Sequence, residues 1–195
     1  NEVKEDTLPD SWRNTAAELF ALEKPVVVMV VGGVDSGKTS FCTFLVNAAV
    51  KQHLKTGIID ADLGQSDVGP PSTVGFNFVS EPVKDLFEVN AEEVVFVGST
   101  SPSGALNKLV FGLTTLKERL LAAGADFVVV NTDGWVEGTE AAEYKVALIK
   151  NVNPSAVVGL QQENELAPIL ASIDDLNFLV VDSPKLIHPR NRENR

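Results

Sequence analysis

Residues 25–40 read PVVVMVVGGVDSGKTS, and this stretch decides the fold. The unbroken apolar run 26–31 is typical of a strand buried on both faces, and it ends at Gly32-Gly33, where the chain must turn. The motif Gly32-x4-Gly37-Lys38-Thr39 then completes a Walker A phosphate-binding loop, and strand, loop and helix follow in the required order. The stretch therefore predicts a site for a nucleoside triphosphate.

The spacing of this loop follows from phosphate chemistry. Its glycines let backbone N–H groups curl around phosphate oxygens, and the helix that follows offers its positive N-terminus to the anion. Lys38 is expected to reach the β- and γ-phosphates, and Thr39 is expected to bind Mg²⁺. The residues predicted to contact the nucleotide are Gly33, Val34, Asp35, Ser36, Gly37, Lys38, Thr39 and Ser40.

Length and composition fit one α/β domain. With 195 residues, 44% of them hydrophobic, the chain can bury an ordinary core without disulfides or a structural metal. Its single cysteine, Cys42, cannot form an internal disulfide and is expected to be a core thiol rather than a reactive one. Only two histidines are present, so the sequence predicts no Cys/His metal cluster.

Charge and hydropathy narrow the partners. A formal net charge of −11 argues against broad, non-specific binding of nucleic acid, although residues 185–195 hold Lys185, Arg190, Arg192 and Arg195 against one acid, Glu193. No apolar run approaches the roughly 20 residues that span a bilayer, and NEVKEDTL does not resemble a signal peptide. We expect no membrane partner and a cytoplasmic location, or a nuclear one in a eukaryote.

The rest of the chain alternates between strand and helix patterns. Residues 10–24 suggest a lead-in helix with Asp10 or Ser11 as its cap and Trp12 as a packing residue. A short hairpin or irregular strand pair is expected at 77–90. The expected helices are 39–53, 106–123, 141–150 and 166–171, and the expected strands are 57–62, 94–97, 127–130, 156–160 and 178–181. This rhythm predicts an α/β P-loop NTPase fold with a mostly parallel sheet and helices on both faces.

Polar loops follow the predicted strands, where such folds bind ligands. Asp60 and Asp62 in DADLGQ are two residues apart at a strand end, so one can serve Mg²⁺ while the other accepts a proton from an attacking group. A solvated strand end with a glycine turn is the plainer alternative for these two acids. Asp60 is the candidate residue for the metal ion.

Two stretches bear on the choice of nucleotide, residues 131–133 and the loop after residue 160. Residues 131–133, Asn-Thr-Asp, lack the lysine and the spacing of the Asn-Lys-x-Asp motif that selects guanine, so ATP is favoured and GTP remains possible. Gln161 and the residues after it lie where amide groups could read a base, though a polar turn fits them equally well.

Five segments together resemble one family. GGVDSGKTS, DADLGQ, STSPSG, NTDGWVEG and LQQENEL occur in the order and with the gaps of the RNA 5′-hydroxyl polynucleotide kinases, which include the messenger-RNA cleavage-factor subunit, the pre-ribosomal-RNA kinase and archaeal relatives. The resemblance covers about residues 25–195. It implies Mg²⁺-dependent transfer of the γ-phosphate of ATP to the 5′-hydroxyl end of RNA or DNA, with RNA-processing proteins as possible partners.

The resemblance also implies roles for particular residues. Lys38 becomes a catalytic residue and Asp62 the base for the 5′-hydroxyl, while the terminal arginines Arg192 and Arg195 resemble a lid that closes over the phosphates from the segment 183–195. The residues expected to hold the acceptor are Gln65, Thr100, Ser101 and Trp135.

Alternatives remain open at three points. Trp135, in a polar loop, either stacks on the acceptor's end base or packs locally, and Thr100 can belong to an ordinary serine/threonine turn. The divisions expected are a lead-in segment 1–24 and a kinase domain 25–195, whereas eukaryotic members of the family carry further domains on both sides. The alternative to a kinase is an ATP-binding scaffold or a slow NTPase switch in an RNA-processing assembly.

Overall fold

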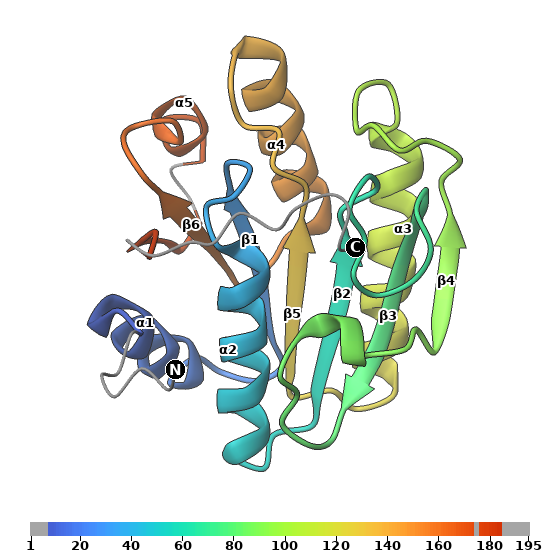
Figure 1. Cartoon of the computed structure of the whole chain (residues 1–195), viewed down its shortest axis with the longest axis vertical. Coiled ribbons are helices and arrows are strands. Elements are labelled where there is room, and N and C mark those ends of the chain that lie inside the picture. Colours follow the sequence, from blue (N-terminus) through green and yellow to red (C-terminus); the bar gives the residue numbers. More distant parts are fainter. Residues whose placement is uncertain (1–7, 174–175, 185–195) are drawn as a thin grey trace, which may run out of the picture.

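The computed structural model describes residues 8–173 and 176–184. Seven strands form one sheet in the order β4-β3-β2-β5-β1-β6-β7 (Figure 1). The strands are β1 (Val26–Gly32), β2 (Thr56–Ala61), β3 (Thr73–Val79), β4 (Glu93–Phe96), β5 (Phe127–Thr132), β6 (Ala156–Gln161) and β7 (Phe178–Asp182). The helices are α1 (Asp10–Phe20), α2 (Lys38–Lys51), α3 (Leu106–Ala122), α4 (Thr139–Val152), α5 (Ala167–Leu170) and the 3₁₀ turn η1 (Leu86–Glu88).

The middle of the sheet is parallel, as the sequence predicts. β1 pairs with both β5 and β6, and the pairs β2–β5 and β6–β7 are also parallel. β1 and β5 are buried at every position, which explains their continuous valine-rich sequences. The carboxyl ends of β2, β5, β1 and β6 therefore meet at one edge of the sheet.

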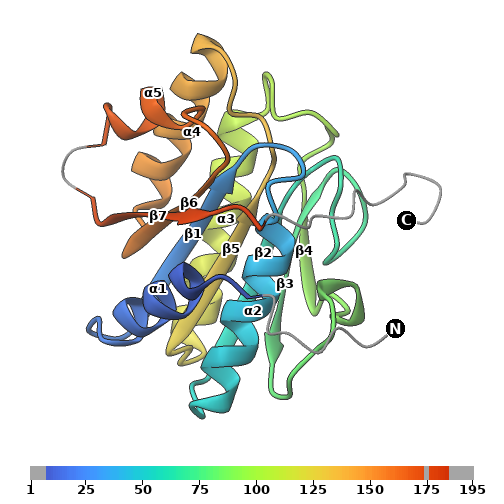
Figure 2. The ribbon, with the colours of Figure 1, turned by 60° about the vertical axis from the view of Figure 1, so that its left-hand side comes forward.

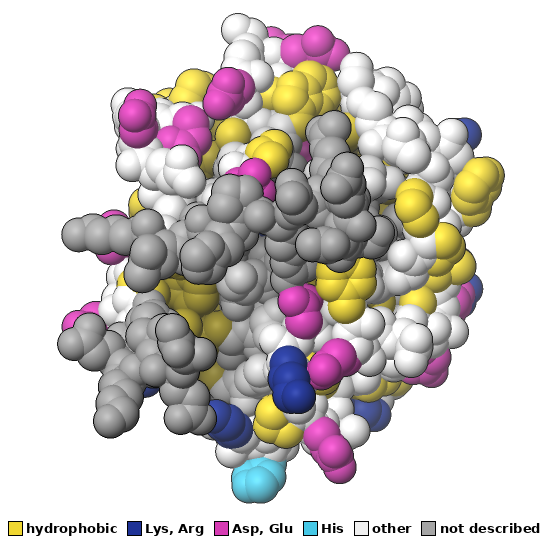
Figure 3. All heavy atoms as spheres, in the orientation of Figure 1, with side chains coloured by type: hydrophobic (Ala, Val, Ile, Leu, Met, Phe, Trp, Pro, Cys, Tyr) yellow, Lys and Arg dark blue, Asp and Glu magenta, His cyan; other side chains and the backbone are white. Residues whose placement is uncertain are grey.

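The β3–β4 part of the sheet differs from the expectation. β3 runs antiparallel to β2 and to β4, and it starts at Thr73, ahead of the short hairpin expected at 77–90. The connection between β2 and β3 is too short for the helical crossover that a parallel pair requires, so the chain returns antiparallel. Exposed apolar side chains gather at the β4 edge (Figure 3), where Val94 and Phe96 are exposed.

Two hydrophobic cores cover the two faces of the sheet. One contains the buried residues of α1 and α2, and the other contains those of α3, α4 and α5, so the helices divide between both faces (Figure 1). Cys42 is fully buried in the first core, and burial raises the pKa of its thiol. It is therefore a core residue, as expected. No helix in residues 8–173 and 176–184 is both long and apolar enough to cross a membrane.

The N-terminal helix α1 packs into this unit. Trp12 is buried, and its ring meets Phe41 of α2 edge-on at 4.9 Å between centroids, so its predicted packing role is confirmed. Trp12 Nε1 also donates a hydrogen bond to the main-chain oxygen of Asp182, at the end of β7. The expected cap is wrong, because Pro9 occupies that position and no side chain caps the helix.

Candidate active site

The phosphate-binding loop joins β1 to α2. Gly37, the residue before α2, has a φ of 95°, which glycine adopts without strain. The Lys38 side chain is buried, and its Nζ donates to the main-chain oxygen of Gly33 at 2.7 Å. Burial, followed by the nearby charge of Lys145, lowers the pKa of Lys38 to about 8. The lysine side chain thus reaches back across its own loop.

A cavity of about 1000 Å³ opens above this loop at the carboxyl edge of the sheet. Residues 33–40 form its floor, and the loops after β2, β5 and β6 form its walls. Gly134 lies so close to Val34 that an added Cβ would be 2.7 Å from Val34 Cγ2 and 2.9 Å from Val34 N, which only glycine permits. The loop that carries Trp135 is therefore in direct contact with the phosphate-binding loop.

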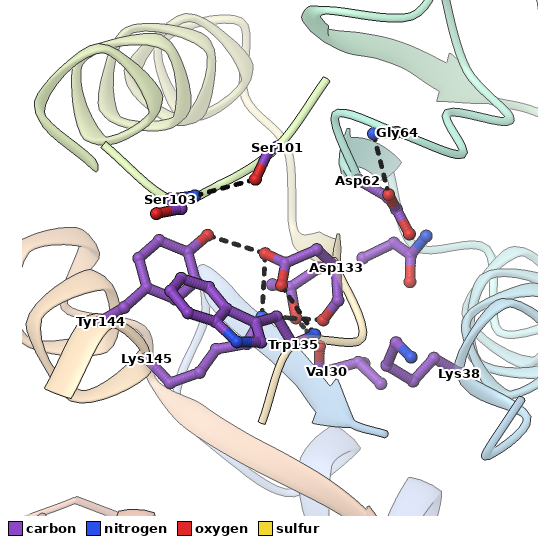
Figure 4. A network of polar contacts seen from close by, with 12 residues as sticks. Val30, Lys38, Asp62, Gly64, Ser101, Ser103, Asp133, Trp135, Tyr144 and Lys145 are labelled. Carbon is purple, nitrogen blue, oxygen red and sulfur yellow. Dashed lines mark hydrogen bonds and ion pairs between the residues drawn. The ribbon is translucent and has the colours of Figure 1, made fainter. Parts of the chain in front are cut away.

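Several predicted site residues line this cavity together. They are Gly33, Val34, Asp35, Ser36, Gly37, Lys38, Thr39, Ser40, Asp62, Gln65 and Trp135. Asp62 is held by the turn that follows it, because its Oδ1 accepts hydrogen bonds from the N–H group of Gly64 at 3.2 Å (Figure 4) and from that of Gln65 at 3.0 Å. Within the described residues its Oδ2 has no hydrogen-bond partner, so this oxygen can accept a proton or approach a metal ion.

Asp60 occupies a different place from the one expected. Its side chain is fully buried and does not line the cavity. Its two oxygens accept hydrogen bonds from the side chains of Asn131 and Ser66 and from the N–H groups of Asp62, Asp67 and Val68. Burial raises the pKa of Asp60 to about 6, against the N–H groups that lower it. These bonds make Asp60 the organising residue of the β2 loop, and its role at the metal ion stays a prediction.

Three other predicted residues also lie outside the cavity wall. Gln161 does not line the cavity, because its Nε2 donates to the main-chain oxygen of Glu163 at 2.6 Å. The next four residues, 162–165, line the cavity in its place. Thr100 and Ser101 are exposed on the loop before α3, of which Pro102 lines the cavity. The bond from the Ser103 N–H to Ser101 Oγ, at 3.3 Å, belongs to a local serine turn, the plainer alternative for this loop.

The predicted lid arginines Arg192 and Arg195 lie outside the described residues. The segment that leads to them starts at the phosphate-binding loop. Ser183 Oγ donates to the main-chain oxygen of Ser36 at 2.9 Å, and Pro184 Cδ lies 3.1 Å from an ideal Cβ on Gly37. Figure 2 shows the end of β7 beside the N-terminal end of α2.

Sequence reasoning missed a buried polar cluster beside the cavity. Asp133, at the end of β5, pairs with Lys145 of α4, with 3.0 Å between Oδ2 and Nζ, and accepts a hydrogen bond from Tyr144 at 2.7 Å (Figure 4). Burial lowers the pKa of Lys145, against the charge of Asp133, and raises that of Tyr144. The signal in the sequence is a lysine between the inward-facing positions Ala141 and Ile149 of a helix.

The cavity can hold a nucleotide-bound metal ion without a metal cluster of its own. Within the described part of the chain, no group of three or more His, Cys, Asp and Glu side chains is arranged for that purpose. Mg²⁺ in phosphotransfer sites takes one or two protein ligands and binds phosphate oxygens and water besides. Thr39, Asp62 and Asp67 all line the cavity and supply the oxygen ligands that Mg²⁺ prefers.

A mostly parallel sheet with a Walker A loop at the end of the buried strand β1 defines the class: this is a P-loop NTPase fold with a nucleotide site at the strand ends. The family follows from comparison. The profile of the family described as mRNA cleavage and polyadenylation factor CLP1 P-loop matches residues 32–195. The chain belongs to this family.

Individual relatives and a solved structure are also similar to this chain. A polyribonucleotide 5′-hydroxyl-kinase of Pyrococcus horikoshii is 34% identical over 187 residues, covering 95% of this chain and 50% of that protein. A CLP1 homologue of Culex quinquefasciatus is 34% identical, covering 87% and 44%. A Clp1p–Pcf11p complex has a TM-score of 0.78 at 15% identity, covering 95% of this chain and 50% of that chain, and so shares the fold. The chain spans about half the length of the curated relatives it matches.

Proposed function

We propose that this chain transfers the γ-phosphate of ATP to the 5′-hydroxyl end of RNA or DNA. The observation that carries the proposal is one cavity that combines a complete phosphate-binding loop with Asp62 and Trp135. A nucleotide switch needs the loop and a metal ion, whereas a kinase also needs a base and a place for its acceptor. Relatives named as polyribonucleotide 5′-hydroxyl-kinases support the same reaction.

The catalytic roles divide between the two sides of the cavity. Lys38 leaves the Gly33 oxygen to contact the β- and γ-phosphates, and the N-terminus of α2 stabilises their charge. Asp62, held by Gly64 and Gln65, accepts the proton of the 5′-hydroxyl as it attacks. Mg²⁺, held by Thr39 and a cavity carboxylate, would neutralise charge on the triphosphate.

The acceptor would enter from the side of the β5 loop. Trp135 is a half-buried wall of the cavity and offers an aromatic surface for the terminal base, with Gln65 beside the reacting end. Acidic side chains gather around α5 and the start of α4 (Figure 3), which disfavours a long polyanion there. We therefore propose that the chain holds only the terminal nucleotides of its acceptor.

ATP consumption distinguishes a kinase from an ATP-binding scaffold or a slow NTPase. We expect that a 5′-hydroxyl oligonucleotide accelerates the release of ADP, and that the same oligonucleotide bearing a 5′-phosphate does not. The measurement is the steady-state rate of ADP formation with each oligonucleotide and with neither. Equal rates in all three reactions would favour the scaffold or NTPase.

Trp135→Ala should weaken acceptor binding selectively. Base stacking contributes about 1–3 kcal/mol, so the KM for the oligonucleotide should rise about 5- to 140-fold while the KM for ATP stays unchanged. Steady-state kinetics with each substrate varied in turn measure both constants. Phe111→Ala, which removes an exposed aromatic ring from α3, is the control. Equal losses for both substrates together with a lower Tm would show that Trp135 only packs locally.

The terminal arginines should act on the chemical step. We propose that Arg192 and Arg195, on a chain that leaves Pro184 beside the phosphate-binding loop, stabilise charge on the transferring phosphoryl group. Deleting residues 190–195 should lower kcat about 10²-fold or more and leave the Kd for ATP within a few-fold. Single-turnover kinetics and ATP titration measure the two effects. Transfer by the truncated chain at the parent rate would place the catalytic arginine elsewhere.

A further inference from the structure

A fully buried lysine lies beside the cavity without lining it. Lys145 Nζ donates to the main-chain oxygen of Asp133 at 2.8 Å and to Thr132 Oγ1 at 3.2 Å, and it pairs with Asp133 Oδ2 at 3.0 Å (Figure 4). An ammonium group has three hydrogens, and these three acceptors account for all of them. Lys145 therefore has no donor left for a phosphate, and its role must be exercised through its neighbours.

Those neighbours contact both the strand that precedes the phosphate-binding loop and the loop that carries Trp135. Thr132 Oγ1 donates to the main-chain oxygen of Val30 at 2.8 Å, which ties the end of β5 to β1, the strand that leads into the phosphate-binding loop. Asp133 Oδ1 accepts the N–H of Trp135 at 3.0 Å, which fixes the backbone of the proposed acceptor platform. One ion pair thus connects the strand before the phosphate-binding loop with the tryptophan.

Tyr144 holds the tryptophan a second time. Its hydroxyl donates to Asp133 Oδ2 at 2.7 Å, and its ring stacks on Trp135 with 5.4 Å between centroids and 30° between planes. Stacking alone would leave the Tyr144 ring free to slide, but the hydroxyl bond to Asp133 fixes it. The Asp133 carboxylate therefore holds the Trp135 backbone directly and the Trp135 ring through Tyr144.

Stability alone does not account for such a cluster. A buried ion pair loses the hydration of both charges, and well-packed apolar residues of the same volume often serve a fold as well or better. What an ion pair adds is direction, since its donors and acceptors are satisfied in one arrangement only. Preorganised side chains lose less entropy when a ligand binds.

We propose that Asp133, Tyr144 and Lys145 are positioning residues that hold Trp135 ready for the terminal base of the acceptor. The inference rests on the proposed function, because it assigns the cluster to the acceptor side of that reaction. It makes a distinct claim, however, since Trp135 could bind the acceptor base without any help from the residues behind it.

The first test compares kinetic constants in the 195-residue chain. Tyr144→Phe keeps the stacked ring and removes one hydrogen bond, so the acceptor KM should rise about fivefold while the ATP KM stays constant. Lys145→Met should have a larger effect of the same kind, because it leaves the Asp133 carboxylate without its cation. Lys117→Met is the matched control: Lys117 Nζ donates to the main-chain oxygen of Val152, away from the cavity.

The second test needs no activity. The chain has two tryptophans, so in a Trp12→Phe background the fluorescence reports on Trp135 alone. Tyr144→Leu should let acrylamide quench this fluorescence about twofold more strongly and should lower its anisotropy, because the stacked ring is gone. The Lys117→Met control should match the background in both measurements.

The outcomes separate the two proposals. If Trp135→Ala raises the acceptor KM but Tyr144→Phe and Lys145→Met lower only the Tm, the inference fails and the proposed function stands. If Trp135→Ala leaves the acceptor KM unchanged, the proposed role of Trp135 fails whatever the cluster does. A selective rise in acceptor KM together with stronger quenching supports the inference, and unchanged quenching in Tyr144→Leu overturns it.

Discussion

Lys38→Ala should reduce phosphoryl transfer about 10²- to 10³-fold, the usual cost of removing one donor that stabilises transition-state charge. The Nζ of Lys38 lies in the phosphate-binding loop, bonded to Gly33 at 2.7 Å, and a bound triphosphate would offer it a stronger, charged acceptor. The affinity for ATP should fall as well, since the lysine contacts ground state and transition state alike. Initial rates with labelled ATP and equilibrium titration measure the two losses.

A second lysine on the same helix supplies the control for this variant. Lys51, in the last turn of α2, is exposed, so Lys51→Ala should keep the parent rate. The fold of Lys38→Ala should persist, because the change removes a single bond to Gly33 and leaves the packing of α2 intact. Undiminished transfer by Lys38→Ala would remove the basis for a nucleotide at this loop.

Asp62→Asn should abolish most transfer while sparing nucleotide binding. The amide keeps the shape of the carboxylate and its Oδ1 can still accept from Gly64 and Gln65, but it cannot take a proton. General-base catalysis contributes about 10²- to 10⁴-fold, so kcat should fall by that factor with the Kd for Mg²⁺–ATP within a few-fold. Single-turnover rates and a nucleotide titration separate chemistry from binding.

Asp67→Asn is the comparison that distinguishes a general base from a metal ligand. Asp67 also lines the cavity, and its carboxylate is a candidate ligand for Mg²⁺ that the proposed proton transfer does not use. We expect this variant to weaken Mg²⁺–ATP binding more than Asp62→Asn does. If binding and transfer fall together in Asp62→Asn, this residue is a metal ligand and the base lies elsewhere.

The centre of the fold was predictable because its signals are local. The β1–loop–α2 unit follows from a run of valines and a glycine-rich motif within sixteen residues, 25–40. The antiparallel β3–β4 part could also have been predicted, since no helix pattern separates β2 from β3. The length of the connection between β2 and β3, which decides the strand direction, can be read from the sequence.

The differences between the expected and the observed positions of site residues have another origin. Asp60 and Asp62 are two residues apart and look alike in sequence, but residues 66–68 fold back and cover only Asp60. The position of residues 66–68 depends on tertiary contacts, and no periodic pattern in the sequence indicates it. Gln161 differs from its neighbours for a similar reason, because its amide bonds within its own turn and leaves residues 162–165 to face the cavity.

Lys145 could have been suspected. In α4 the buried positions include Ala141, Leu148, Ile149 and Val152, and the lysine shares their face of the helix. A charged residue on an apolar face requires a buried partner, and that partner is an acid at the end of a neighbouring strand. Which acid it would be depends on how α4 packs against β5, and this is a property of the folded chain alone.

The most direct measurement follows the γ-phosphate itself. The chain is incubated with γ-labelled ATP, Mg²⁺ and a 5′-hydroxyl oligonucleotide, and the oligonucleotide is then digested to mononucleotides. We predict that the label appears in the 5′-terminal nucleotide, that Asp62→Asn and Lys38→Ala reduce this labelling about 10²-fold or more, and that α-labelled ATP transfers nothing. Label released only as inorganic phosphate, with the oligonucleotide unlabelled by the parent chain, would contradict a kinase and leave an NTPase.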